Sequence, residues 1–345
     1  VDAEGNVREE TPLMRDYDEI TELRIYRADD TPITVKGGHF THIVNDTPMV
    51  KEDWGYFGRG IPVNRSNTTI DGLTHIVTGE LPGINETGNT DPKGPPYGGF
   101  IGVSFTNDVR ILNCTLTARR PSGIAGTYDF QGNMSNNLYL YNVNQSNYYG
   151  EDGVTPTLDY KHTWGIGGTN FCKNLLVEDC VMSRYDAHEG VSNITIRGCT
   201  LGHQCLNLIG FGDALIENTR GYGNAFIVLR PDYGSFWHGN ITIKNCVWQP
   251  SGNGMNHVIY AKHNGTHDFG YPCSMPTRLT INGFKVLNGA FEDKAVRIVT
   301  PYCDPAAERT YDYGTIKVLT VKDFVTESGE GYNVCTVPEL LPDIK

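Results

Sequence analysis

The chain has 345 residues, of which 28 are Lys or Arg and 40 are Asp or Glu, so its formal net charge is −12. No basic stripe is present to contact phosphates, which disfavours a nucleic-acid-binding protein. Hydrophobic residues make up 39% of the chain and aromatic residues 10%, which is enough for a core and excludes a disordered protein. No run of about 18 apolar residues occurs, so we expect no membrane span.

The chain begins at Val1 with VDAEGNVREETP, which is neither a signal peptide nor an initiator Met. We therefore expect a processed chain that works outside the cell, as a secreted, cell-surface or periplasmic protein. Residues 1–32 are predicted to form an N-terminal cap, within which Arg15–Leu23 is the best candidate for a helix. Residues 33–345 contain no Pro/Ser-rich linker and are predicted to form one domain.

A nine-residue template recurs through this domain and predicts short strands. It begins with Asn or Asp, continues with alternating apolar residues, and places a small residue at its seventh position. The strong copies are DVRILNCTL (108–116), NLYLYNVNQ (137–145), NLLVEDCVM (174–182), NITIRGCTL (193–201), DALIENTRG (213–221) and NITIKNCVW (240–248). The weaker copies are PITVKGGHF (32–40), NTTIDGLTH (67–75), RLTINGFKV (278–286) and TIKVLTVKD (315–323).

The spacing of the copies predicts an all-β fold, a single-stranded right-handed parallel β-helix. Cys180 and Cys199, at the seventh position of neighbouring copies, are 19 residues apart. This length fits a coil of three short strands, whereas propeller blades and helical repeats need roughly 34–45 residues. Aligned residues of coils ~4.8 Å apart form ladders, so the cysteines at the seventh position are expected to be buried free thiols. These are Cys114, Cys180, Cys199 and Cys246, and Cys273 with Cys303 is the candidate disulfide.

The densest cluster of reactive side chains is the segment SRYDAHEG. Asp186 and His188 are two residues apart and share one face of a strand, about 6.5–7 Å from each other. Such a pair can hold a metal, or place an acid and a base around a sugar. Tyr185 and Arg230 join them as candidate catalytic residues, with Arg230 suited to a sugar carboxylate. A structural Asp–His hydrogen bond and an Arg–Asp salt bridge are the alternatives.

Neighbouring copies add polar and aromatic residues along one predicted line across the coils. His203 completes the candidate catalytic set. An extended polymer fits a groove of this kind, because both repeat along one direction. The candidate substrate-binding residues are Arg119, Arg120, Tyr148, Tyr149, His162, Trp164, Arg184, Gln204, Asn207, Asp232, Tyr233 and Trp237.

The coil template with its Cys and Asn ladders resembles the pectate-lyase-like superfamily of parallel β-helix proteins, over roughly residues 33–335. That superfamily includes polysaccharide lyases, glycoside hydrolases, uronan epimerases and phage tailspikes. The string YDAHE is similar to the D-P-H-D motif of mannuronan C5-epimerases, with Ala187 replacing Pro and Glu189 replacing the second Asp. The resemblance implies that Asp186, His188, a Tyr and an Arg surround a uronate. The strings TWGIGGTNFCKN and SRYDAHEG also resemble uncharacterised secreted β-helix proteins of gut-type bacteria.

Three classes of function stay open on the sequence. The favoured one is a carbohydrate-active enzyme with lyase or epimerase acid/base chemistry on an extended polysaccharide. A glycoside hydrolase would need paired carboxylates, for which Asp186 with Asp232 or Glu189 are candidates and Asp129 and Asp152 are reserves. The other classes are a non-catalytic glycan-binding tailspike or adhesin and a passive solenoid. No cofactor is indicated, calcium has no specific motif, and the oligomeric state stays open.

Overall fold

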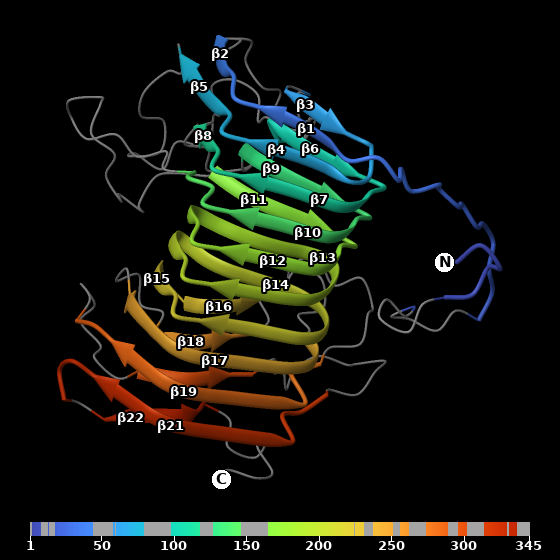
Figure 1. The fold of residues 1–345 in the computed structure, drawn as a ribbon. Coiled ribbons are helices and arrows are strands. Elements are labelled where there is room, and N and C mark those ends of the chain that lie inside the picture. Colours follow the sequence, from blue (N-terminus) through green and yellow to red (C-terminus); the bar gives the residue numbers. More distant parts are fainter. Residues whose placement is uncertain are drawn as a thin grey trace, which may run out of the picture.

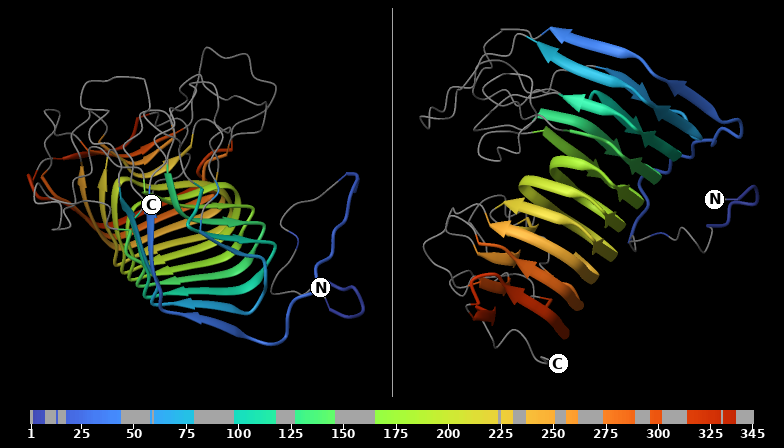
Figure 2. Two further views of the ribbon diagram at one scale, coloured as in Figure 1. Left: turned by 90° about the horizontal axis from the view of Figure 1, so that it is seen from above. Right: turned by 60° about the vertical axis from the view of Figure 1, so that its left-hand side comes forward.

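The computed structural model describes residues 2–7, 13, 18–43, 58, 60–78, 98–117, 127–145, 165–223, 225–230, 237–250, 256–261, 274–288, 296–301, 314–329 and 331–336. These residues form 22 strands and no helix, and the strand pairings among them are all parallel. The described part of the chain is therefore all-β, as predicted. Figures 1 and 2 show the strands stacked along one direction, from the N-terminal to the C-terminal end.

The pairings arrange the strands in three columns, in which each strand lies next to the strand of the following repeat. Column A contains β3 (Ile61–Val63), β6 (Ile101–Ser104), β9 (Thr127–Asn133), β11 (Gly165–Asn170), β16 (Ala225–Leu229), β18 (His257–Tyr260), β20 (Val296–Thr300) and β22 (Tyr332–Cys335). Column B begins with β1 (Ile33–Lys36), β4 (Thr68–Asp71), β7 (Asn107–Leu112), β10 (Asn136–Tyr141) and β12 (Lys173–Glu178). Column C begins with β2 (His39–Ile43), β5 (Thr74–Thr78) and β8 (Thr115–Thr117), and later includes β15 (Arg220–Gly223).

Five longer strands continue from one column into the next. β13 (Val181–Arg197) and β14 (Thr200–Glu217) pass through columns C, A and B in turn, as their successive partners show. β17 (Trp237–Pro250), β19 (Arg278–Val286) and β21 (Val318–Thr326) pass through columns B and C. The chain therefore visits the columns in a fixed order, one repeat after another.

The template explains the core, because alternate residues of each copy point inward. In β7, Val109 and Ile111 are buried, and they stack on Leu138 and Leu140 of β10. The seventh position continues this core through the cysteines, all four of which are buried free thiols, as predicted. Two buried aliphatic side chains per copy contribute about 1.5–3 kcal/mol each in transfer free energy, which is the main stabilising term. Cys273 and Cys303 lie outside the described residues.

The corner between columns B and C explains why Asn, Asp and Gly recur at the sixth template position. Asn113, Asn142, Asn218 and Asn245 all have φ between 51° and 54°. Asn tolerates this left-handed conformation better than other residues with a Cβ. Its amide also bonds along the stack: Asn142 Nδ2 donates to Asn113 Oδ1 at 2.9 Å. The Asn-rich turns are thus ladders, as the sequence indicates.

Two sequence predictions differ from the structure in this part of the molecule. The last template copy lies at Val318–Thr326 rather than at 315–323, because Val318 pairs with Arg278. Both alignments bury an apolar residue near the start, Ile316 or Leu319, so the pattern alone did not separate them. In the helix candidate, residues 18–23 are not helical. Ile20 and Leu23 are 72% and 73% exposed, so no apolar helix face would be buried.

Within the described residues no helix is long and apolar enough to cross a membrane. Within the predicted cap, residues 22–28 run beside the corner between columns A and B, and β1 begins at Ile33. Figure 1 shows the chain before β1 leaving the stack at this corner.

Candidate functional site

The candidate site is centred on a buried carboxylate in the column A part of β13. Asp186 is 1% exposed, and its Oδ2 atom contacts two guanidinium groups. Arg184 Nη2 lies 2.5 Å from that oxygen, and Arg230 Nη1 lies 3.3 Å from it. Arg230 follows β16, which lies two coils further along the stack than β13. β14 lies between these two strands, and its residue Asn207 is in register with Asp186. Two arginine side chains therefore contact the same carboxylate oxygen.

These charges decide the ionisation of Asp186. Burial by itself would raise the pKa of the carboxyl group. The positive charges of Arg184 and Arg230, with smaller contributions from His188 and a hydrogen bond from Arg184, outweigh burial and hold the pKa below its ordinary value. Asp186 therefore stays ionised at neutral pH and is a weak proton acceptor.

His188 borders this cluster and is held by the preceding coil. Its Nδ1 atom lies 2.9 Å from Asn170 Oδ1, and Asn170 Nδ2 donates to Asn133 Oδ1 at 3.1 Å. Because an amide oxygen accepts, Nδ1 carries the proton in this pair and the neutral ring then has its lone pair on Nε2. Asn170 and Asn133 have no counterpart among the residues proposed from the sequence. They are therefore positioning residues that sequence reasoning missed.

Tyr185 lies on the inner side of the same strand. It is fully buried in the core, next to Gly167 of β11, where an added Cβ would lie 3.3 Å from Tyr185 Cδ2. Burial raises the pKa of its phenol group well above the ordinary range. The Tyr185 hydroxyl interacts with the Thr169 side chain in the core but makes no well-formed hydrogen bond with the described residues. This position favours packing over the predicted contact with substrate.

Three candidate substrate-binding residues are described, and all of them are buried. Arg184 is an ion-pair partner of Asp186, and Asn207 is in register with Asp186. Trp237 is fully buried at the corner between columns A and B, where its Nε1 donates to Gly212 O at 3.0 Å. Trp237 therefore supports the corner from inside and does not offer a ring to a ligand.

Several candidates cannot be placed relative to the cluster. The backbones of His203 and Gln204 belong to β14, but their side chains lie outside the described residues. At the corner between columns C and A, β14 has two more residues than β13. Tyr185 and Asp186 therefore pair with Leu206 and Asn207 rather than with the predicted Gln204 and Cys205. The remaining candidates lie outside the described residues: Arg119, Arg120, Tyr148, Tyr149, His162, Trp164, Asp232 and Tyr233.

A metal site does not emerge from the described side chains. No group of three or more His, Cys, Asp or Glu among them is arranged to hold an ion. The Asp186 carboxylate, whose Oδ2 contacts two arginines, is also a poor ligand, because a cation there would face two positive charges.

Comparison with known proteins adds little to this geometry. No family model matches the chain, and no curated protein sequence matches it. The structure of the Streptococcus pneumoniae surface protein and adhesin PfbA is similar over 90% of this chain and 90% of that chain, with 12% identity and a TM-score of 0.44. A crystal structure of PfbA, a surface adhesin of Streptococcus pneumoniae, covers 91% and 82%, with 14% identity and a TM-score of 0.38. Likeness at this level carries no function over to the chain.

Proposed function

We propose that this protein is a right-handed parallel β-helix that binds an acidic polysaccharide outside the cell, across the outer side of column A. In this proposal the Asp186 cluster recognises a carboxylate or sulfate of the sugar chain. The observation that carries it is the pair of guanidinium groups on one carboxylate, of which the Arg230 group is the more exposed.

Arg230 is the residue that would contact the ligand. Its side chain is 16% exposed, against 9% for Arg184 and 1% for Asp186, so it is the member of the cluster nearest to solvent. The guanidinium fork contacts carboxylates and sulfates through two parallel hydrogen bonds. Arg184 and Asp186 would orient Arg230 and keep its charge partly desolvated, which strengthens its attraction for an anion.

Binding is supported better than acid/base catalysis. A lyase or epimerase needs a base to remove the proton next to the uronate carboxylate. Tyr185 lies in the core, and Asp186 is held ionised by two arginines, so neither is suited to that step. His188 is the described candidate that remains, because Asn170 fixes its ring and directs its Nε2 lone pair away from that contact. Elimination with His188 as the base is therefore the second candidate function.

Hydrolysis has less support from the described residues. It needs two carboxylates about 5–5.5 Å or 6.5–9.5 Å apart, one of which carries a proton. Asp186 is ionised, and Asp129 is fully buried in β9. Asp152, Asp232 and the side chain of Glu189 lie outside the described residues.

A binding titration with paired arginine variants tests the proposal. Arg230→Ala is expected to lose at least about tenfold in affinity for polygalacturonate, alginate or a sulfated glycan, and Arg230→Lys to lose less. The matched control is Arg197→Ala, because Arg197 lies in the column B part of β13 and also contacts two carboxylates, Glu178 at 2.7 Å and Glu217 at 2.5 Å. Equal affinity of the two alanine variants and the wild type would refute the proposed site.

Activity assays with the same polymers distinguish binding from catalysis. Absorbance at about 235 nm from an unsaturated uronate, absent in His188→Ala, would identify a lyase. Proton exchange at the uronate without this absorbance, seen by proton NMR, would identify an epimerase. Binding without either signal supports the non-catalytic function.

A further inference from the structure

A row of exposed apolar residues follows the corner between columns A and B. Phe105, Met134 and Phe171 each directly follow a column A strand, in three successive coils, and they are 44%, 53% and 39% exposed. Backbone hydrogen bonds fix the stacking, because Phe105 N donates to Asn133 O and Met134 N donates to Asn170 O. We call these three residues the corner stripe.

The backbone of the corner stripe is strained. The φ angles of Phe105, Met134 and Phe171 are 56°, 45° and 51°. A left-handed conformation costs roughly 1–2 kcal/mol for a residue with a Cβ, and Asn or Gly is the usual solution. At the corner between columns B and C the left-handed positions are occupied by such residues, for example Asn142. Bulky apolar residues in this conformation strain the turn and, being largely exposed, bury little surface in the core, so neither the turn nor the core explains their presence.

The corner stripe is continuous with the Asp186 cluster. Asn133 precedes Met134 and Asn170 precedes Phe171, and these two asparagines form the hydrogen-bonded row that ends on His188. The apolar stripe and the row leading to the cluster therefore lie side by side across the same coils.

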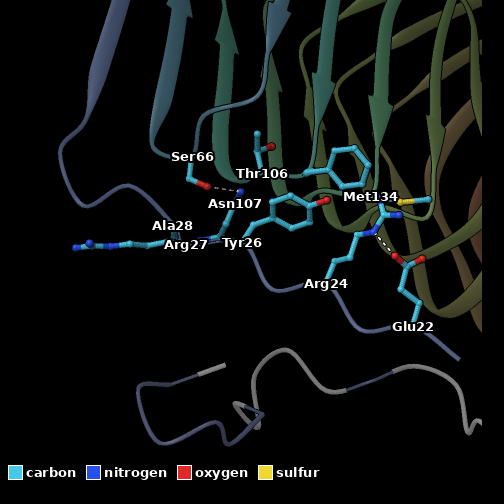
Figure 3. A pocket seen from close by; sticks show the side chains of 10 residues that line it. Glu22, Arg24, Tyr26, Arg27, Ala28, Ser66, Thr106, Asn107 and Met134 are labelled. Atoms are coloured by element: carbon cyan, nitrogen blue, oxygen red, sulfur yellow. Dashed lines mark hydrogen bonds and ion pairs between the residues drawn. The ribbon is translucent and has the colours of Figure 1, made fainter. Parts of the chain in front are cut away.

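At its other end the corner stripe meets the N-terminal segment. The ring of Tyr26 stacks on Phe105 with the centroids 5.2 Å apart and the planes at 26°. Figure 3 shows Arg24 and Tyr26 approaching the corner next to Met134 and Thr106. The pocket between them has a volume of about 630 Å³, which is within the range of ligand pockets.

We propose that the corner stripe is the extended part of the polysaccharide site, so that a bound chain runs across the coils from the Asp186 cluster to the pocket beside Tyr26. This inference rests on the proposed function. Coils about 4.8 Å apart present one apolar side chain for each pyranose of an extended chain, and the C–H face of a sugar packs on aromatic and thioether groups. Arg24 is 65% exposed and forms an ion pair with Glu22. Surface ion pairs are weak, so the carboxylate of a sugar acid can replace Glu22 as the partner of Arg24.

The test compares short and long oligosaccharides on a variant that removes the corner stripe. The triple variant Phe105→Asn/Met134→Asn/Phe171→Asn keeps the left-handed turns and relieves their strain, so it is expected to unfold at a higher temperature than the wild type. The probes are galacturonate and mannuronate disaccharides and hexasaccharides, titrated by calorimetry. The control is Tyr141→Asn/Val325→Asn, which removes exposed apolar side chains from columns B and C.

We expect the wild type to bind the hexasaccharide at least about tenfold more tightly than the disaccharide, which corresponds to ~1.4 kcal/mol. In the triple variant this ratio falls to about one while the disaccharide affinity is unchanged, and the control keeps the ratio. A ratio unchanged in the more stable triple variant overturns the inference and leaves the proposed function intact. Failure of the wild type to bind any of the probes overturns both.

Discussion

Replacing Asp186 by Ala tests the central ionic cluster through stability alone, without a ligand. The variant removes the carboxylate that both guanidinium groups contact, and Arg184, at 9% side-chain exposure, has little water to replace it. Removing one partner of a buried ion pair costs about 3–5 kcal/mol. Arg230→Ala is expected to cost less, about 1–2 kcal/mol, because Arg184 still neutralises Asp186 and Arg230 is the more exposed of the two arginines.

The free energy of unfolding is measured by urea denaturation, monitored by circular dichroism. Its pH dependence provides an internal check. The folded-state pKa of Asp186 is lowered, so the stability that its charge provides is fully present above the unfolded pKa of about 3.9. It is lost as the pH falls through the lower folded-state pKa, so the wild type and Asp186→Ala should converge in acid. The double variant Arg184→Met/Asp186→Leu should recover most of the loss at neutral pH. A loss below about 1 kcal/mol for Asp186→Ala at pH 7 would refute this account of the cluster.

Three further predictions follow from the core and its corners. Burial raises the pKa of Cys246 to about 11, and Cys180 is buried as well, so both thiols should resist an alkylating reagent at pH 8 until the protein unfolds. Peptide mapping measures this labelling, and labelling of the folded protein would contradict their burial. Tyr185→Phe should keep or raise the free energy of unfolding by up to about 1 kcal/mol and keep ligand binding, since the buried hydroxyl makes no well-formed hydrogen bond with the described residues. A loss of turnover on an identified substrate would restore Tyr185 as a reactive group. Asn142→Gly should cost less in melting temperature than Asn142→Val, because the position has a φ of 51°; the reverse order would contradict a left-handed turn there.

The repeat could be predicted from sequence because each copy carries the same local information. Alternating apolar residues, a left-handed Asn and a small seventh residue recur together, so the register of Asn137 on Asp108 follows from aligning two strings, and Asn137 Nδ2 donates to Asp108 Oδ1 at 2.9 Å. The register failed where local information is ambiguous. The two additional residues in β14 shift Asp186 from Cys205 to Asn207, and no composition signal marks a bulge of that kind.

The site was predictable only in part, because a residue type does not state which side of a strand it occupies. The sequence offered Asp186 and Asp232 as alternative salt-bridge partners of Arg230, and the structure shows the pair with Asp186, whereas Tyr185, next in the chain, points into the core. The corner stripe did leave a signal. The strings SFTND, NMSNN and NFCKN each place a bulky apolar residue three positions before the start of a template copy. Such a residue falls in the turn rather than in the periodic strand, where apolar residues were sought.

The stacking of strands also determines how the molecule would unfold. Every described strand pairing joins neighbouring coils, as β13 pairs with β11 and β12 on one side and with β14 on the other. Cooperativity in such an array passes only from one coil to the next. A lesion in the coil of Asp186 would therefore divide the protein into an N-terminal and a C-terminal block that melt independently. In a variant whose Asp186 coil is unfolded, scanning calorimetry would then record two transitions where one is expected for the wild type, and a protease would release two folded fragments cut near the centre of the chain.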